Sequence, residues 1–309
     1  MGRIIRLIVS TIFILVGAAL FFYPDVLTEK VDSDSTKSIT IFEETYPGSD
    51  MKGDEQNDAL DALWETIEEY NRGIYENGQE DFKDAWSYEQ APIKLDGLEG
   101  DVFGYINIPD MDIEYPLYLG ASTSNMLKGA AILGETSIPV GGENTNSVIA
   151  GHRGYSGIPF FRNIENLAPG DPVYITNPWG TLGYRVESIK IIDPTDIDAV
   201  KIQEGLDMIT LLTCHPYRSS GPYRYLVYCI RDKSLESEET NEEPKVEIKE
   251  TTVEIPDSSA NDIEMEQKIR QIGKIMIVAI LIITVIRGIR NWHKDRLKSD
   301  MSARRKRRR

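Results

Sequence analysis

The sequence predicts a mostly β fold, a single sandwich or barrel, placed between two membrane segments. Short runs rich in Val, Ile and Tyr, separated by Gly, Pro and Asp, follow one another over 102–233. Evenly spaced short strands over about 130 residues are typical of one β sandwich or barrel. The membrane segments are predicted from apolar runs near each end of the chain.

The first membrane segment is residues 1–24, "MGRIIRLIVSTIFILVGAALFFYP". Arg3 and Arg6 precede an uncharged apolar run from Leu7 to Tyr23, the pattern of a signal peptide or a membrane anchor. A signal peptide needs small residues at a cleavage site just past the run, and "ALFFYPDV" is a poor one. An uncleaved anchor is therefore favoured, with cleavage as the open alternative.

The second membrane segment is residues 269–290, whose charge-free centre runs only from Ile275 to Ile286. A centre this short also suits a buried core helix. Lys274 and Arg287 bracket it, however, and long basic side chains at such positions reach the lipid headgroups. The tail 291–309 is basic, so the positive-inside rule predicts both termini in the cytoplasm and the region between the segments outside the cell membrane.

Charge is divided unevenly along the chain. The formal net charge is −16, and the basic ends contribute +2 and +11, so residues 7–268 carry −29. A domain this acidic is a poor ligand for nucleic acid and is repelled by anionic lipid. We therefore expect no nucleic-acid partner.

Four regions are expected between the membrane segments. Residues 25–53 are acidic and rich in Ser and Thr, as in a stalk, and 234–268 have the composition of an acidic linker. A helix is expected within 54–101, because apolar residues recur there at helical spacing, and the β domain follows over 102–233. The apolar residues of this helix are Leu60, Leu63, Trp64, Ile67, Tyr70 and Ile74.

The chain has two cysteines, Cys214 and Cys229. In "TLLTCHPYRSSGPYR" the Pro, Ser and Gly residues predict a hairpin turn centred near Ser219, which sets Cys214 opposite Arg224. Cys229 then lies about 16 Å along its strand from Cys214, whereas a disulfide needs Cα atoms within roughly 7 Å. No disulfide is expected, and Cys229 is interpreted as a small buried strand residue.

Cys214 is either a buried free thiol or a nucleophile. A thiol at a strand end beside a turn is accessible, and a facing guanidinium favours a thiolate and stabilises an oxyanion. A nucleophilic thiol also needs an imidazole. Of the three histidines, His293 is expected in the cytoplasm and His215 points away from Cys214 if the strand continues, which leaves His152 as the candidate base.

The chain resembles the sortases, and specifically the class C, pilin-polymerising sortases. "TLLTC" matches the sortase signature TLxTC in full, and "GYINIPDMDIEYPLYLGAS" and "LKGAAILGETSIPVGGENTNSVIAGHRG" resemble the sequence around the family's catalytic histidine. The resemblance covers Val102 to Arg231. It implies a closed eight-stranded β-barrel with short helices, with Cys214 as nucleophile, His152 as general acid/base and Arg224 as transition-state stabiliser.

Two departures from the class C pattern bear on these assignments. The arginine usually follows the cysteine by nine residues, whereas Arg224 follows by ten, and Ser219 and Ser220 stand where an asparagine is expected. The trailing "RYLV" favours Arg224, and Arg218 remains the rival. The segment "DAWSYEQ", with Asp84 and Trp86, resembles the class C lid except for an alanine in place of proline; the alternative is an ordinary acidic surface loop.

The resemblance implies an extracellular transpeptidase of a Gram-positive cell wall. It is expected to cleave an LPXTG-like sorting signal between Thr and Gly and to join the thioacyl intermediate to a pilin lysine, without metal or other cofactor. Three alternatives remain: a housekeeping-type sortase acting on peptidoglycan amines, a non-catalytic surface scaffold, and a secreted cysteine protease.

Overall fold

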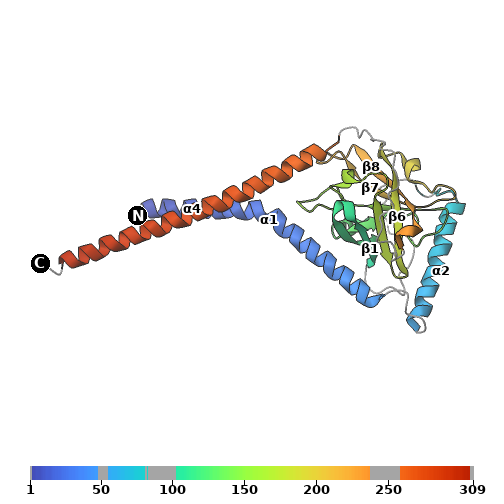
Figure 1. The fold of residues 1–309 in the computed structure, drawn as a ribbon, viewed down its shortest axis with the longest axis horizontal. Coiled ribbons are helices and arrows are strands. Elements are labelled where there is room, and N and C mark those ends of the chain that lie inside the picture. Colours follow the sequence, from blue (N-terminus) through green and yellow to red (C-terminus); the bar gives the residue numbers. More distant parts are fainter. Residues whose placement is uncertain (1, 48–54, 81, 83–101, 237–257, 307–309) are drawn as a thin grey trace. The chain divides into compact units, whose positions relative to one another are not determined.

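The computed structural model describes residues 2–47, 55–80, 82, 102–236 and 258–306 (Figure 1). These fall into two compact units. One runs from Phe22 to Ser259 and contains the barrel, and the other consists of the terminal segments Met1–Phe21 and Ala260–Arg309.

Eight strands form a closed barrel in the order β1-β2-β3-β4-β7-β8-β6-β5, which confirms the predicted fold class. The β2–β3 and β4–β7 pairs are parallel and the other pairs are antiparallel. The strands are β1 (Val102–Ile108), β2 (Ile113–Leu119), β3 (Ala130–Ile132), β4 (Thr145–Ala150), β5 (Pro172–Asn177), β6 (Gly180–Ile192), β7 (Asp207–His215) and β8 (Tyr223–Arg231).

Strand β7 is buried on both faces. Ile209 and Leu211 belong to the larger hydrophobic core, whereas Met208 and Leu212 belong to a second cluster. Because successive side chains of a strand point to opposite faces, these two sets lie on opposite sides of the sheet. This explains why β7 is a continuous apolar run in the sequence, and it gives the strand that carries Cys214 a rigid central place.

Helix α1 (Gly2–Thr45) continues well past the apolar run into the stretch predicted as an acidic stalk. Five residues recur at intervals of three or four along one face of α1 and just past its end. Each of them is buried or packs against the hydrophobic core: Val31, Ser35, Ile39, Phe42 and Tyr46. Tyr105 on β1 also donates a hydrogen bond from Oη to Glu43 Oε1 at 3.0 Å. The stalk prediction is therefore wrong for residues 25–45, because exposed Ser, Asp and Lys residues mask a helical pattern.

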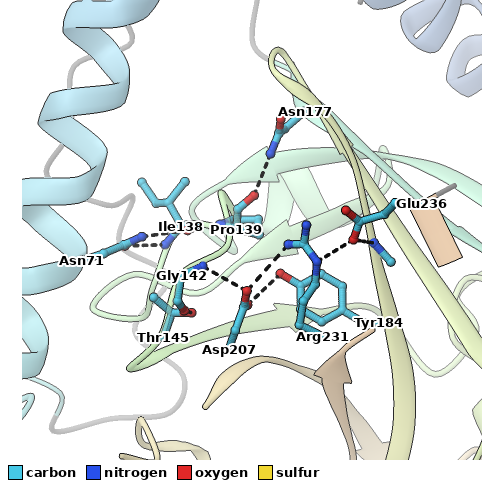
Figure 2. Close-up of polar contacts among 11 residues, drawn as sticks. Asn71, Ile138, Pro139, Gly142, Thr145, Asn177, Tyr184, Asp207, Arg231 and Glu236 are labelled. Atoms are coloured by element: carbon cyan, nitrogen blue, oxygen red, sulfur yellow. Dashed lines mark hydrogen bonds and ion pairs between the residues drawn. The ribbon is translucent and has the colours of Figure 1, made fainter. Parts of the chain in front are cut away.

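Helix α2 (Glu55–Glu76) confirms the helix predicted within 54–101. Leu60, Leu63, Ile67 and Ile74 are buried, as their spacing predicts. Asn71 fixes the helix to the loop after β3, because its Nδ2 donates to Ile138 O at 2.9 Å and its Oδ1 accepts from Ile138 N at 2.8 Å (Figure 2).

The structure describes both ends of the predicted linker 234–268, and helical residues are present at each. Its first residues belong to η4 (Lys233–Glu236), where Glu236 Oε1 accepts a hydrogen bond from Gly183 N at 3.0 Å. Its last residues begin α4 (Ala260–Lys306). The remaining short helices are α3 (Thr123–Met126), η1 (Pro109–Met111), η2 (Ile164–Asn166) and η3 (Ile197–Val200).

Both predicted membrane segments lie in long helices. Residues 1–24 fall at the start of α1, and 269–290 fall inside α4. Each helix contains a stretch long and apolar enough to cross a membrane, within Val9–Thr45 and Ala260–Arg290 respectively.

Candidate active site

The hairpin between β7 and β8 forms with the predicted register. Cys214 pairs with Arg224 and His215 pairs with Tyr223, so the turn is centred on Ser219. Ser219 closes the turn, because its Oγ donates to Pro216 O at 2.6 Å and accepts from Gly221 N at 3.0 Å. The predicted placement of Cys214 opposite Arg224 is confirmed.

The two cysteines occupy different environments. Cys229 pairs with Ile209 on the neighbouring strand, and both thiols are free, so the prediction of no disulfide is confirmed. Cys229 is fully buried, and burial raises the pKa of its thiol far above the ordinary value. Cys214 is half-buried at the strand end, so it is the more accessible thiol of the two.

Gly221 creates the space that the thiol and the Arg224 guanidinium share. A Cβ built on Gly221 would lie 3.2 Å from Cys214 Sγ and 3.3 Å from Arg224 Nη1, so both groups border the same hollow. Arg224 Nη1 is held there by donating to Gly221 O at 2.5 Å and to Tyr223 O at 2.9 Å. Arg218 is instead exposed in the turn, with its guanidinium 5.6 Å from the Tyr217 ring centroid.

His152 is brought level with Cys214 by the parallel pairing of β4 with β7. In every pair of this ladder the β7 residue comes 62 positions after its β4 partner, and the last pair is Ala150 with Leu212. The same offset continues beyond β4, because Gly151 N donates to Leu212 O at 3.1 Å and Thr213 Oγ1 donates to Gly151 O at 2.7 Å. His152 therefore follows in the position that corresponds to Cys214.

Aromatic side chains shape the surroundings of His152. Its ring stacks on Tyr155 with centroids 5.1 Å apart and meets the edge of Phe160 at 5.9 Å. Its Nε2 is buried and has no hydrogen-bond partner in the part of the chain that the structure describes. Burial lowers the pKa of His152 below its ordinary value, so the imidazole is mainly neutral at pH 7.

His215 faces the other side of β7, as strand alternation predicts. It is buried, its ring lies 5.6 Å from that of Tyr225, and its Nδ1 is 3.6 Å from Glu165 Oε1. Glu165 is a buried carboxylate that the sequence pattern does not reveal, since a single acidic residue in "NIENL" has the appearance of a surface position.

The other predicted residues lie outside this site. His293 is on α4, in the other compact unit. The lid residues Asp84 and Trp86 lie outside the described residues. Among the residues that the structure does describe, no three His, Cys, Asp or Glu side chains are arranged to hold a metal ion.

Comparison with known proteins gives one consistent family. Residues 106–232 match the family model described as the sortase domain. Sortase A of Staphylococcus aureus is 32% identical over 155 residues, which are 50% of this chain and 72% of that protein.

The similar solved structures are class C sortases. Sortase C1 of GBS pilus island 1 has 28% identity and a TM-score of 0.55, with 68% of this chain and 96% of that chain covered. Sortase C of Clostridium perfringens SM101 has 34% identity and a TM-score of 0.52, with 63% and 98% covered. The chain therefore belongs to the sortase family of cysteine transpeptidases, and its structural neighbours are class C members.

Proposed function

We propose that this protein is a membrane-anchored, extracellular class C sortase that joins pilin subunits. Cys214 is the nucleophile, His152 the general acid/base, and Arg224 the group that stabilises the oxyanion. The observation that carries these roles is the register: β8 sets Arg224 opposite Cys214, and β4 brings His152 level with it.

In the first half-reaction, the Cys214 thiolate attacks the carbonyl carbon of Thr in an LPXTG-like sorting signal. The carbonyl oxygen becomes an oxyanion, which the Arg224 guanidinium stabilises at the hollow beside Gly221. The C–N bond to Gly then breaks, and protonated His152 gives its proton to the departing amine. The products are a thioester on Cys214 and a peptide that begins with Gly.

In the second half-reaction, the amine of a lysine on another pilin attacks the thioester. Neutral His152 takes the proton from this amine, the Cys214 thiolate leaves, and an isopeptide bond forms. Because burial lowers the pKa of His152, the neutral form that this step needs predominates at pH 7, whereas the protonated form used in the first step is the minority.

Two of the similar solved structures support this proposal. One is sortase C1 of a pilus island, which favours a pilin acceptor, and another is Clostridium perfringens sortase C with the C-terminal cell wall sorting motif, which favours a sorting signal as substrate. The basic flanks of the apolar segments support both termini in the cytoplasm and the acidic barrel unit outside.

The test is a product analysis with full-length protein in detergent micelles. An LPXTG peptide is offered with two acceptors in competition, a purified pilin fragment with its lysine and a peptidoglycan precursor amine. Isopeptide linkage to the pilin lysine supports the proposal. A predominant peptidoglycan product supports a housekeeping-type sortase, and hydrolysis despite excess amine supports a cysteine protease. Absence of any thioester on Cys214 would support a non-catalytic scaffold.

The segment with Asp84 and Trp86 is proposed as a lid over this site. One of the similar solved structures is described as a lid mutant of Streptococcus agalactiae sortase C1, so a lid exists in that relative. Covering an extracellular thiolate limits its oxidation and wasteful hydrolysis. We expect the double variant Asp84→Ala, Trp86→Ala to raise both the rate of Cys214 alkylation and the rate of peptide cleavage. Unchanged rates would identify this segment as an ordinary surface loop.

A further inference from the structure

The residue that follows each proposed catalytic residue belongs to one buried cluster. These residues are Arg153, His215 and Tyr225, which follow His152, Cys214 and Arg224 respectively, and their exposed fractions are 5%, 1% and 0%. On β7 and β8 successive side chains point to opposite faces of the sheet. The reactive side chains on these strands therefore lie on one face, and their neighbours lie behind them.

Tyr225 joins the other two members of the cluster. The Arg153 guanidinium carbon lies 5.4 Å from the centroid of the Tyr225 ring, and the His215 ring lies 5.6 Å from it at an angle of 41°. The ends of β7 and β8 and the loop after β4 thus meet through residues that lie behind the candidate active site.

Glu165 on η2 holds this cluster with a single carboxylate whose side chain is 2% exposed. Its Oε1 accepts a hydrogen bond from Arg153 Nη2 and lies 3.6 Å from His215 Nδ1. Its Oε2 accepts from Ser258 Oγ at 2.9 Å and from Ser259 N at 2.8 Å. The last two residues before α4 are therefore bound to the same carboxylate as the residues behind His152 and Cys214.

The cluster requires an anion at position 165. Arg153, Ser258 and Ser259 all present hydrogen-bond donors, and a carboxylate is the side chain that accepts from all of them. A glutamine of the same size would turn an NH₂ group toward at least one of these donors. Glutamine is also uncharged, so no negative charge at position 165 would balance the buried Arg153 guanidinium.

We propose that Glu165 is a positioning residue of the catalytic centre. By holding Arg153 and His215 to one carboxylate, it fixes the spacing between His152 and Cys214, and it makes that spacing depend on the docking of Ser258 and Ser259. This inference rests on the proposed roles of His152 and Cys214. The contacts of Glu165 are with Arg153, His215 and residues 258–259, so we assign it a positioning role and not a catalytic one.

The first test is Glu165→Gln in the full-length protein in detergent micelles, with kcat expressed per Cys214 thiol that can be alkylated. Small displacements of catalytic groups cost up to about 100-fold in rate, so we expect kcat to fall by about 10- to 100-fold with KM little changed. Glu165→Asp keeps the charge and should recover part of the loss.

Glu236→Gln is the matched control. Glu236 also accepts from a guanidinium and a backbone N–H, those of Arg231 and Gly183, at 2.6 and 3.0 Å. It lies on η4, beside the strand end of β8 that is farthest from Arg224. This variant should lower the melting temperature without lowering kcat per thiol. Equal losses of kcat in Glu165→Gln and Glu236→Gln would overturn the proposal.

A second variant, Ser259→Pro, covers the case in which Glu165→Gln does not fold. Proline removes the N–H that Glu165 accepts, and it is tolerated directly before α4 because the first turn of a helix does not use that N–H. It also removes the hydroxyl that accepts from Tyr217 N at 3.0 Å. We expect a smaller fall in kcat at unchanged melting temperature, and an unchanged kcat would exclude any coupling to residues 258–259.

The rate of Cys214 alkylation by iodoacetamide separates this proposal from the proposed function, because it needs no peptide. If the wild-type protein fails to cleave the LPXTG peptide, the proposed function is wrong. A slower alkylation of Cys214 in folded Glu165→Asp and Ser259→Pro than in Glu236→Gln would still support positioning. Equal alkylation rates in these three variants would overturn it.

Discussion

The β7–β8 ladder carries an arginine at each end, and the two arginines are held in different ways. At the end opposite the catalytic centre, Arg231 is bound by carboxylates (Figure 2). Its Nη1 lies 3.6 Å from Asp207 Oδ2, and its Nε donates to Glu236 Oε1 at 2.6 Å. Asp207 in turn accepts from Tyr184 Oη at 3.2 Å and from Gly142 N at 2.9 Å.

At the catalytic end, Arg224 Nη1 donates to two backbone carbonyl oxygens, those of Gly221 and Tyr223. These two hydrogen bonds go to uncharged carbonyl oxygens and fix the direction of the guanidinium, whereas those of Arg231 go to carboxylates. The Asp193 carboxylate also interacts electrostatically with Arg224. One ladder thus holds its arginine by carboxylates at one end and by backbone carbonyl oxygens beside Cys214 at the other, where we propose that the guanidinium stabilises an oxyanion.

The largest expected difference concerns the two cysteines. Cys214→Ala should abolish cleavage of an LPXTG peptide, because no other accessible thiol lies among the described residues. Cys229→Ala should retain most activity and lose only some stability, since it removes one buried sulfur. Peptide cleavage followed by mass spectrometry measures both, and equal losses would contradict the assignment of the nucleophile.

The two arginines should separate activity from stability. Arg224→Ala removes the proposed oxyanion donor, and loss of one such donor typically costs about 10²- to 10³-fold in kcat. Arg224→Lys should also be poor, since an ammonium does not reproduce the planar guanidinium. Arg231→Ala should leave kcat per folded molecule near wild type.

Arg218→Ala is the control for this comparison, because Arg218 is exposed in the turn. If it lowers kcat more than Arg224→Ala does, the oxyanion role belongs to Arg218.

Substitutions at the end of the ladder that holds Arg231 should change mainly the free energy of unfolding. Asp207→Asn replaces one of the two carboxylates beside Arg231 with a neutral amide, and breaking a buried ion pair costs about 3 to 5 kcal/mol. Because Glu236 still faces Arg231, we expect a loss below that range. The free energy of unfolding from urea titration measures this loss. A fall in kcat per alkylatable Cys214 would instead show that the two ends of the ladder are coupled.

The smallest expected effect is the pH dependence from His152. Since burial lowers its pKa below 6.5 in the folded state, the unfolded chain binds more protons as the pH falls below 6.5. The free energy of unfolding should therefore decrease from pH 6.5 downward until the folded-state pKa is reached. Comparison of urea titrations at several pH values with those of His152→Gln should show a shallower slope in the variant.

Local sequence rules predicted the hairpin around Ser219 well, because turn residues and strand alternation act over a few residues. The position of Cys214 opposite Arg224 and the separation of the two cysteines follow from that single turn, and the direction of His215, away from Cys214, follows from strand alternation. The roles of Cys214, His152 and Arg224 in catalysis stay predictions that the variants above test.

Two features escaped prediction because they depend on distant contacts. The packed part of α1 has an apolar face diluted by Ser, Asp and Lys, so composition pointed to a stalk. Glu165 is buried against Arg153 and His215, which come from distant parts of the chain, and no local pattern encodes such contacts.

Gly221 has a consequence for how this protein tolerates random mutation. The backbone there has φ of +72°, and any added side chain would meet Cys214 Sγ and Arg224 Nη1. Every replacement of this residue is therefore strained in its backbone and also fills the space between the Cys214 thiol and the Arg224 guanidinium. A genetic screen for folded but inactive protein should return changes at Gly221 beside those at Cys214, although Gly221 contributes no functional group.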